Sequence, residues 1–162
     1  MAIRNIRTDE DPILRKISKE VNDINDRMKT LISDMCETMD YSNGVGLAAP
    51  QVGILRRIIT VDDQDGLRGA FINPKIIEKD GEQVGPEGCL SVPGKQGTVN
   101  RANHIVVTYM DEKGEEKTLE AEGFTARIFQ HEIDHLNGIL YTDLATEIHN
   151  IQDEDDEVEE WE

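Results

Sequence analysis

The segment QHEIDH places His131 and His135 four residues apart, with Glu132 between them. In an α-helix, residues four apart are separated by roughly 40° around the axis, so both imidazoles can reach one cation. Glu132, roughly 100° from His131, then lies beside that cation rather than on it. The pattern H-E-x-x-H therefore predicts two metal ligands and a general base on one helix. The alternative is a pair of surface histidines next to a glutamate.

A metal site needs at least one further ligand from elsewhere in the chain. Downstream, Tyr141 stands where one class of zinc proteases has its third His, and Glu154 lies in an acidic run without an apolar face. Upstream, Cys89 lies in PEGCLSVPG, a Gly- and Pro-rich stretch where a side chain can project into a cleft. A buried structural Cys is the other interpretation. The other two histidines, His104 and His149, are expected at the surface.

One Cys and two His would leave a fourth position open for water, which is typical of a catalytic metal site. A divalent ion held in this way makes water acidic enough to react near neutral pH. Glu132 could take the proton from that water and pass it to a leaving amine. These residues predict metal-assisted hydrolysis of an amide, which also needs a group that stabilises the oxyanion.

The glycine loop GVGLAAPQVG fits the dinucleotide pattern G-x-G-x-x-A from Gly44 to Ala49, but its context does not. A predicted helix precedes it instead of a strand, and Pro50 opposes the helix that should begin there. Glycines at these positions equally suit a chain that lies close to an extended ligand. The amide of Gln51, which follows directly, could donate to an oxyanion, although a loop Gln is usually only solvated.

Hydrophobic periodicity predicts the elements around these residues. Apolar residues recur at helical spacing over 24–40, and DPILRK predicts a short helix with Asp11 as N-cap and Pro12 at its first position. Strands are expected over 54–61 and 69–78, with Pro74 at an edge or a bulge. Segments 104–110 and 115–121 flank the turn DEKG and predict a hairpin. A helix from about Gly123 ends at Asn137–Gly138. The order favours an α+β fold, with antiparallel sheets packed around the central helix that carries HExxH.

Composition excludes several classes of protein. The 162 residues suit one domain, and the formal net charge is −17. With the nine carboxylates from Glu147 onward set aside, that charge becomes −8, which argues against nucleic-acid binding. No apolar run is long enough for a membrane span, and the N-terminus lacks a secretory signal. We expect a soluble cytoplasmic protein with a domain over 1–148 and an acidic, disordered tail over 149–162.

With these stretches together, the chain resembles peptide deformylase. That family carries G-x-G-L-A-A-x-Q, E-G-C-L-S and Q-H-E-x-D-H in this order, and residues 44–51, 87–91 and 130–135 match without a mismatch. The likeness extends from DPILRKIS to GILYTDL, over roughly residues 3 to 145. The resemblance implies removal of the formyl group from the N-terminal formyl-methionine of new polypeptides, with release of formate.

The resemblance also implies a role for each matched residue. Cys89, His131 and His135 would hold one divalent metal per chain, with Glu132 as the acid/base. The family's ion is generally Fe²⁺, which Ni²⁺, Co²⁺ or Zn²⁺ can replace; the ligand set alone suits zinc equally well. The side chain of Gln51 and the backbone N–H of Leu90 would polarise the formyl oxygen. The substrate backbone would pair with three residues: Val45, Gly46 and Gly88.

The methionine side chain is expected in an apolar pocket beside His131. Phe124, Arg127 and Ile128 lie on its side of the helix and, with Val45, could wall that pocket, with the Arg127 guanidinium at the rim. Phe124 and Ile128 could instead belong only to the core.

Partners follow from the same resemblance. They are formyl-methionyl nascent peptides and a transient ribosome contact that does not run through the acidic tail, without direct nucleic-acid or membrane binding. The protein is expected to be a monomer. Two rival interpretations are another small HExxH metallohydrolase, such as a peptidase, and a non-catalytic deformylase-like binding protein. The first leaves Cys89 unexplained, and loss of Glu132 or Gln51 would have indicated the second.

Overall fold

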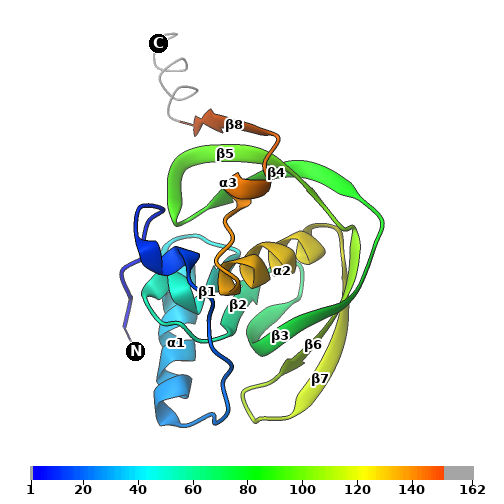
Figure 1. Cartoon of the computed structure of the whole chain (residues 1–162). Coiled ribbons are helices and arrows are strands. Elements are labelled where there is room, and N and C mark those ends of the chain that lie inside the picture. Colours follow the sequence, from blue (N-terminus) through cyan, green and yellow to red (C-terminus); the bar gives the residue numbers. More distant parts are fainter. Residues whose placement is uncertain (1, 152–162) are drawn as a thin grey trace.

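A computed structural model describes residues 2–151 and contains both helices and strands (Figure 1). Residues 152–162, which make up most of the predicted tail, lie outside the described residues. The elements in chain order are η1 (Pro12–Arg15), α1 (Asp26–Tyr41), β1 (Gly46–Ala48), η2 (Ala49–Val52), β2 (Ile58–Asp62), β3 (Arg68–Asp80), β4 (Gln83–Cys89), β5 (Val92–Arg101), β6 (His104–Met110), β7 (Glu116–Glu122), α2 (Gly123–Leu136), α3 (Tyr141–Leu144) and β8 (Glu147–Asn150).

The strands form two antiparallel sheets. One has five strands in the order β1-β2-β3-β6-β7, and the other has three in the order β4-β5-β8. Helix α2, which carries HExxH, lies between the two sheets (Figure 1). The predicted α+β class with a central HExxH helix is therefore confirmed.

Successive residues in the strands of the five-stranded sheet point to opposite faces, and both faces are apolar. Ile59 and Phe71 are register partners that pack in the core cluster with α2 residues such as Phe129. Their neighbours Ile58 and Ile72, also partners, pack instead in the cluster with α1. Because successive strand residues point to opposite faces, the sheet is covered by α1 on one side and by α2 on the other.

The predicted helices form close to their expected bounds. The side chain of Asn25 caps α1 by accepting from the Met28 N–H, and Asp11 caps η1 in the same way from Ile13. Helix α2 begins at Gly123 and ends at Leu136, with Asn137 as its C-cap, as predicted. The next residue, Gly138, has φ +75°, and a Cβ there would lie 2.6 Å from the carbonyl oxygen of Arg15. Only glycine fits this turn without strain.

The first two predicted strands form, but the earlier one is shorter than expected. Residues 54–57 belong to the connection from η2, and β2 begins only at Ile58. Pro74 lies within β3 at a register shift between Ile72 and Lys75, so it is accommodated by a bulge. The hairpin predicted around DEKG is β6–β7 and pairs from His104–Glu122 to Met110–Glu116.

The hairpin β4–β5 is the main element that the sequence did not predict. Segment 83–89 contains Gly85, Pro86 and Gly88, which are unfavourable inside a strand. Strand β4 tolerates Pro86 because it is the outer strand of its sheet, where one side of the backbone needs no ladder partner.

The chain returns to this sheet near its C-terminal end. Strand β8 pairs with β5 from Glu147–Thr98 to Asn150–Lys95. It therefore continues two residues past the predicted domain boundary at 148. Among residues 2–151, no helix has the length and apolar character needed to cross a membrane.

Candidate metal centre and catalytic site

Helix α2 and the end of β4 bring three side chains together that could hold a metal. The donor atoms of Cys89, His131 and His135 all lie within 4.8 Å of one another. Both histidines are buried, and Cys89 Sγ lies 3.3 Å from His135 Nε2. Cys89 reaches them because it is the last residue of β4, where the hairpin turns toward α2.

The donor set fits a first-row divalent ion. With metal–sulfur bonds of about 2.3 Å and metal–nitrogen bonds of about 2.0 Å, a tetrahedral site places S and N about 3.5 Å apart. The separation between Cys89 and His135 is close to this value. The Nδ1 of His131 is occupied by a carboxylate, so its Nε2 is the nitrogen available for an ion.

Glu132 lies next to this group with one oxygen free. Its side chain is buried, and Oε1 has no hydrogen-bond partner among the described residues. Burial raises the pKa of Glu132 to about 7; a cation bound beside it would oppose that shift. The backbone of β1 touches the same carboxylate, because a Cβ on Gly46 would lie only 2.5 Å from Glu132 Oε2. Glycine at 46 is what permits this approach.

The side chain of Gln51 is held so that its amide points at Cys89. Its Oε1 accepts from the Ala48 N–H at 2.9 Å, which leaves the NH₂ group directed toward β4–β5. There Nε2 donates to Ser91 Oγ at 3.0 Å and lies 3.6 Å from Cys89 Sγ. Gln51 is buried, so it is not the solvated loop residue of the alternative interpretation.

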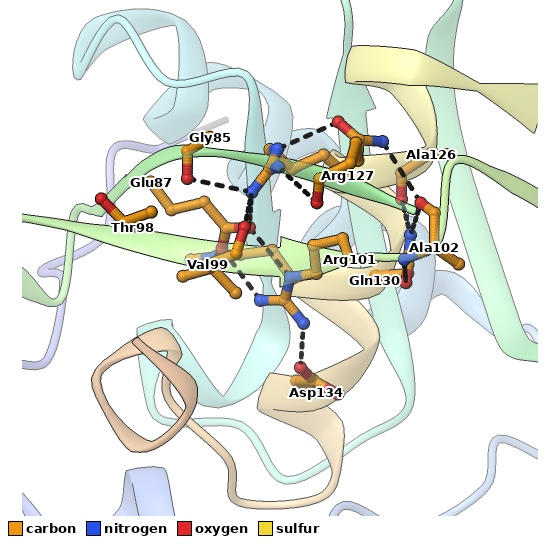
Figure 2. A network of polar contacts seen from close by, with 12 residues as sticks. Gly85, Glu87, Thr98, Val99, Arg101, Ala102, Ala126, Arg127, Gln130 and Asp134 are labelled. Carbon is orange, nitrogen blue, oxygen red and sulfur yellow. Dashed lines mark hydrogen bonds and ion pairs between the residues drawn. The ribbon is translucent and has the colours of Figure 1, made fainter. Parts of the chain in front are cut away.

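Glu87 belongs to a buried ionic network with Arg101 and Arg127 (Figure 2), and it also contacts His131. Glu87 Oε1 accepts from His131 Nδ1 at 2.8 Å, and Arg101 donates to both oxygens of Glu87 at 2.8 Å. Burial alone would raise the pKa of Glu87, but the bonds from Arg101 and His131 lower it to about 2. Glu87 is therefore ionised and fixes the orientation of the His131 ring.

Sequence reasoning did not identify Glu87, Arg101 or Ser91. A signal for Glu87 was present, because a metal-bound His usually donates its second N–H to a carboxylate. Glu87 lies two residues before Cys89, a spacing that places both on one face of a strand. That signal could be used only once β4 was known to be a strand.

A cavity of about 370 Å³ opens beside these groups. All of the predicted site residues except His135, which lies deeper, contribute to its lining: Val45, Gly46, Gln51, Gly88, Cys89, Leu90, Phe124, Arg127, Ile128, His131 and Glu132. It lies between β1 and β4, and each of these strands is at one edge of its sheet. An extended ligand could therefore pair with free backbone groups on both sides.

The three helix residues expected in the pocket wall differ in their environments. Phe124 is 54% exposed and so does not belong to the core, whereas Ile128 lines the cavity and also packs in the core cluster with α2. The Arg127 guanidinium was expected at the rim, but the Arg127 side chain is only 7% exposed. It is buried because Glu87 and backbone carbonyls of the second sheet surround it.

The chain is similar to known peptide deformylases in both sequence and structure. The family model described as Polypeptide deformylase matches residues 3–150. The chain is 58% identical to Peptide deformylase 1 of Clostridium perfringens over 144 residues, which cover 88% of this chain and 98% of that one. It is 50% identical to a peptide deformylase of Agathobacter rectalis over 156 residues, 96% of this chain and 98% of the relative. The crystal structure of peptide deformylase from Thermotoga maritima superposes with a TM-score of 0.86 at 44% identity, covering 90% of this chain and 99% of that one.

Proposed function

This chain belongs to the peptide deformylase family, and we propose the roles that its own residues take in the reaction. The enzyme removes the formyl group from the N-terminal formyl-methionine of newly synthesised polypeptides and depends on a metal ion. Neither a different HExxH peptidase nor a non-catalytic binding protein is favoured by the relatives. The observation that carries the proposed roles is the convergence of Cys89, His131 and His135 beside Glu132 at one end of the cavity.

Cys89, His131 and His135 are proposed to hold one divalent ion, with Fe²⁺ as the native ion by family resemblance and Ni²⁺, Co²⁺ or Zn²⁺ as substitutes. Thiolate and imidazole donors suit all four ions. The bound ion supplies Lewis-acid activation of water and of the formyl oxygen.

Glu132 takes a proton from the water that attacks the formyl carbon and returns it to the amine when the C–N bond breaks. The products are formate and a peptide with a free methionine amine. The unpartnered Oε1 of Glu132 supports this role, since it is an acceptor without a competing donor among the described residues.

Gln51 and Leu90 stabilise the negative charge that develops on the formyl oxygen as water adds. The Gln51 amide is directed toward Cys89 by its bond to Ala48, and the backbone N–H of Leu90 follows Cys89 in the chain. Donors that are fixed in advance stabilise such charge without reorganisation.

The substrate is proposed to lie between β1 and β4, with its backbone paired to Val45, Gly46 and Gly88. Its methionine side chain enters the pocket whose wall is formed by Val45, Phe124, Arg127 and Ile128. The position of these residues around the cavity supports this arrangement.

We also propose that the enzyme acts in the cytoplasm as a monomer, with a domain over 1–148 and an acidic tail over 149–162. Its contact with the ribosome is transient and does not run through the tail, because eight carboxylates after Ile151 without Lys or Arg would be repelled by RNA. The same charge supports an enzyme that binds neither nucleic acid nor membrane directly.

The test is a formate-release assay on formyl-Met-Ala-Ser after anaerobic purification, with acetyl-Met-Ala-Ser as the matched control and with metal quantified. Formate from the formyl peptide alone, in proportion to bound iron or nickel near one per chain, is the expected result. Full metal content without formate would contradict the roles of Glu132 and Gln51. A folded protein that takes up no metal would contradict the ligand set.

A further inference from the structure

Arg127 connects α2 to both strands of the β4–β5 hairpin (Figure 2). Its Nη1 donates to Glu87 Oε2 at 2.6 Å and to the Val99 carbonyl at 3.2 Å. Its Nε donates to Gln83 Oε1 at 3.3 Å. The carbonyls of Gly85 and Gln83 accept two longer bonds at 3.5 Å. A guanidinium held by five acceptors has little freedom to move.

Glu87 is the residue through which Arg127 reaches the proposed metal ligands. Of its two oxygens, Oε1 accepts from His131 and Arg101, and Oε2 accepts from Arg101 and Arg127. The carboxylate plane is thereby fixed, and the direction of the bond to His131 is fixed with it. The orientation of that bond determines where the His131 ring points.

The two arginines that contact Glu87 differ in their other ion-pair partners. Arg101 is shared with a second carboxylate, since its Nη1 donates to Asp134 Oδ2 at 2.6 Å. Within the described part of the chain, Arg127 forms an ion pair only with Glu87. Removing one partner of a buried ion pair is strongly destabilising, so the bond from Arg127 to Oε2 helps to hold the Glu87 carboxylate in place.

Arg127 differs from its neighbours in the cavity wall. Phe124 and Ile128 line the same cavity from the same helix, but neither takes part in the network around Glu87. Arg127 thus lines the proposed methionine pocket and also contacts Glu87, the carboxylate that orients His131.

We propose that Arg127 is a positioning residue that acts through Glu87 to fix the ring of His131, and so sets the metal affinity of the site as well as one wall of the methionine pocket. This inference rests on the proposed ligand set of Cys89, His131 and His135.

The experiment measures metal binding separately from activity. The full-length apo protein and its variants Arg127→Met and Arg127→Lys are titrated with Zn²⁺ and Co²⁺ against a chromophoric chelator, and the visible absorption of each Co²⁺ form is recorded. Changes in groups that support a metal ligand typically weaken affinity by about 10- to 100-fold. We expect about tenfold for Arg127→Met, a smaller loss for Arg127→Lys, and an altered Co²⁺ spectrum in both.

Phe124→Leu is the matched control, because it changes the same wall without touching Glu87. It should raise KM for formyl-Met-Ala-Ser while leaving metal affinity and the Co²⁺ spectrum at wild-type values. A second control compares the single variant Glu87→Gln with the double variant that carries both Glu87→Gln and Arg127→Met. In the Glu87→Gln background, the added Arg127 change should weaken metal binding by less than about twofold, since the path through Glu87 is already broken.

A folded Arg127→Met protein with wild-type affinity and spectrum would overturn the inference, whatever its thermal stability. If that variant does not fold, Arg127→Lys decides, and wild-type values there overturn it as well. Failure of the underlying ligand set is distinguishable, because the wild-type protein itself would then bind neither ion.

Discussion

Helices α1 and α2 cover opposite faces of the five-stranded sheet but bury different kinds of side chain. Helix α1 buries mostly an apolar stripe that includes Leu31, Ile32, Met35 and Met39. Helix α2 buries apolar residues together with five polar or charged ones: Arg127, Gln130, His131, Glu132 and His135. Both are regular helices of similar length, so the helical backbone alone does not make a site.

The two helices differ in what contacts the side that faces away from the five-stranded sheet. Part of α1 remains in contact with solvent, whereas α2 is enclosed by the sheet on one side and by the β4–β5 hairpin on the other. The hairpin supplies Glu87, Arg101 and backbone carbonyls as partners for the polar residues of α2. Buried polar groups are tolerable only when they are paired in this way.

The largest expected effect is on activity, from Glu132→Ala in α2. Loss of a general acid–base should lower kcat/KM for formyl-Met-Ala-Ser by roughly 10²- to 10⁴-fold. Metal content should stay near one per chain, because Glu132 is not among the proposed ligands. Metal analysis and formate release on one preparation check both points. Full activity, or loss of metal, would show that the roles within α2 are divided incorrectly.

The next effect is on stability, from Met35→Ala in α1. Met35 is fully buried in the cluster between α1 and the sheet, so we expect the free energy of unfolding to fall by about 2–5 kcal/mol. Urea denaturation measures this fall. At temperatures where the variant is folded, kcat/KM should be unchanged, and a large drop there would mean that α1 also shapes the site.

Gln130→Met tests a polar side chain of α2 that lies outside the reaction. Gln130 accepts from the Ala102 N–H and donates to the carbonyls of Ala102 and Ala126. Methionine has a similar volume but leaves the Ala102 groups unpaired, so stability should fall by about 1–3 kcal/mol. Urea denaturation of wild type and variant gives the difference. No loss of stability would indicate that water replaces the amide, and that α2 is less enclosed than its contacts imply.

The smallest effect concerns a polar contact of α1, between the buried Asp34 and the N-terminal segment. Burial opposes ionisation of Asp34, but bonds from the Ala2 N–H and the Arg4 guanidinium outweigh it and lower its pKa. A lowered folded-state pKa adds stability above the ordinary Asp pKa of 3.8, and this part is lost as pH falls through the lowered value. The stability difference between wild type and Asp34→Asn should therefore be largest near neutral pH and shrink below pH 3.8. Denaturation at several pH values checks this; a difference that grows on acidification would contradict it.

The sequence predicted α1 well because an amphipathic stripe reports directly on burial against one face. It predicted that α2 is a helix and that His131 and His135 share a side, since these are properties of the helix itself. It could not predict the second sheet. Strand β4 is held by its pairing with β5 rather than by its own composition. Gly85 and Pro86 are unfavourable in strands, so local sequence does not predict it. The partners of the α2 polar residues were missed for this reason.

The same limit explains the error at Arg127. A long cation on a helix beside a pocket is normally expected to extend its charge toward water. Here the acceptors inside the protein outcompete solvent, but they belong to β4 and β5, which local sequence did not reveal. Long-range pairing decided the position of the charge.

The contact between Gly46 and Glu132 has a consequence for how this enzyme can vary. A methyl group at position 46 would collide with the Glu132 carboxylate, and retracting that carboxylate would remove the acid/base from the substrate. A side chain at position 46 is therefore incompatible with the present position of the Glu132 carboxylate. A library that diversifies the glycine loop should hold residue 46 fixed. A Cβ at position 44 would lie 2.9 Å from the Leu90 side chain, so Val45 is the better position at which to redesign this edge of the cavity.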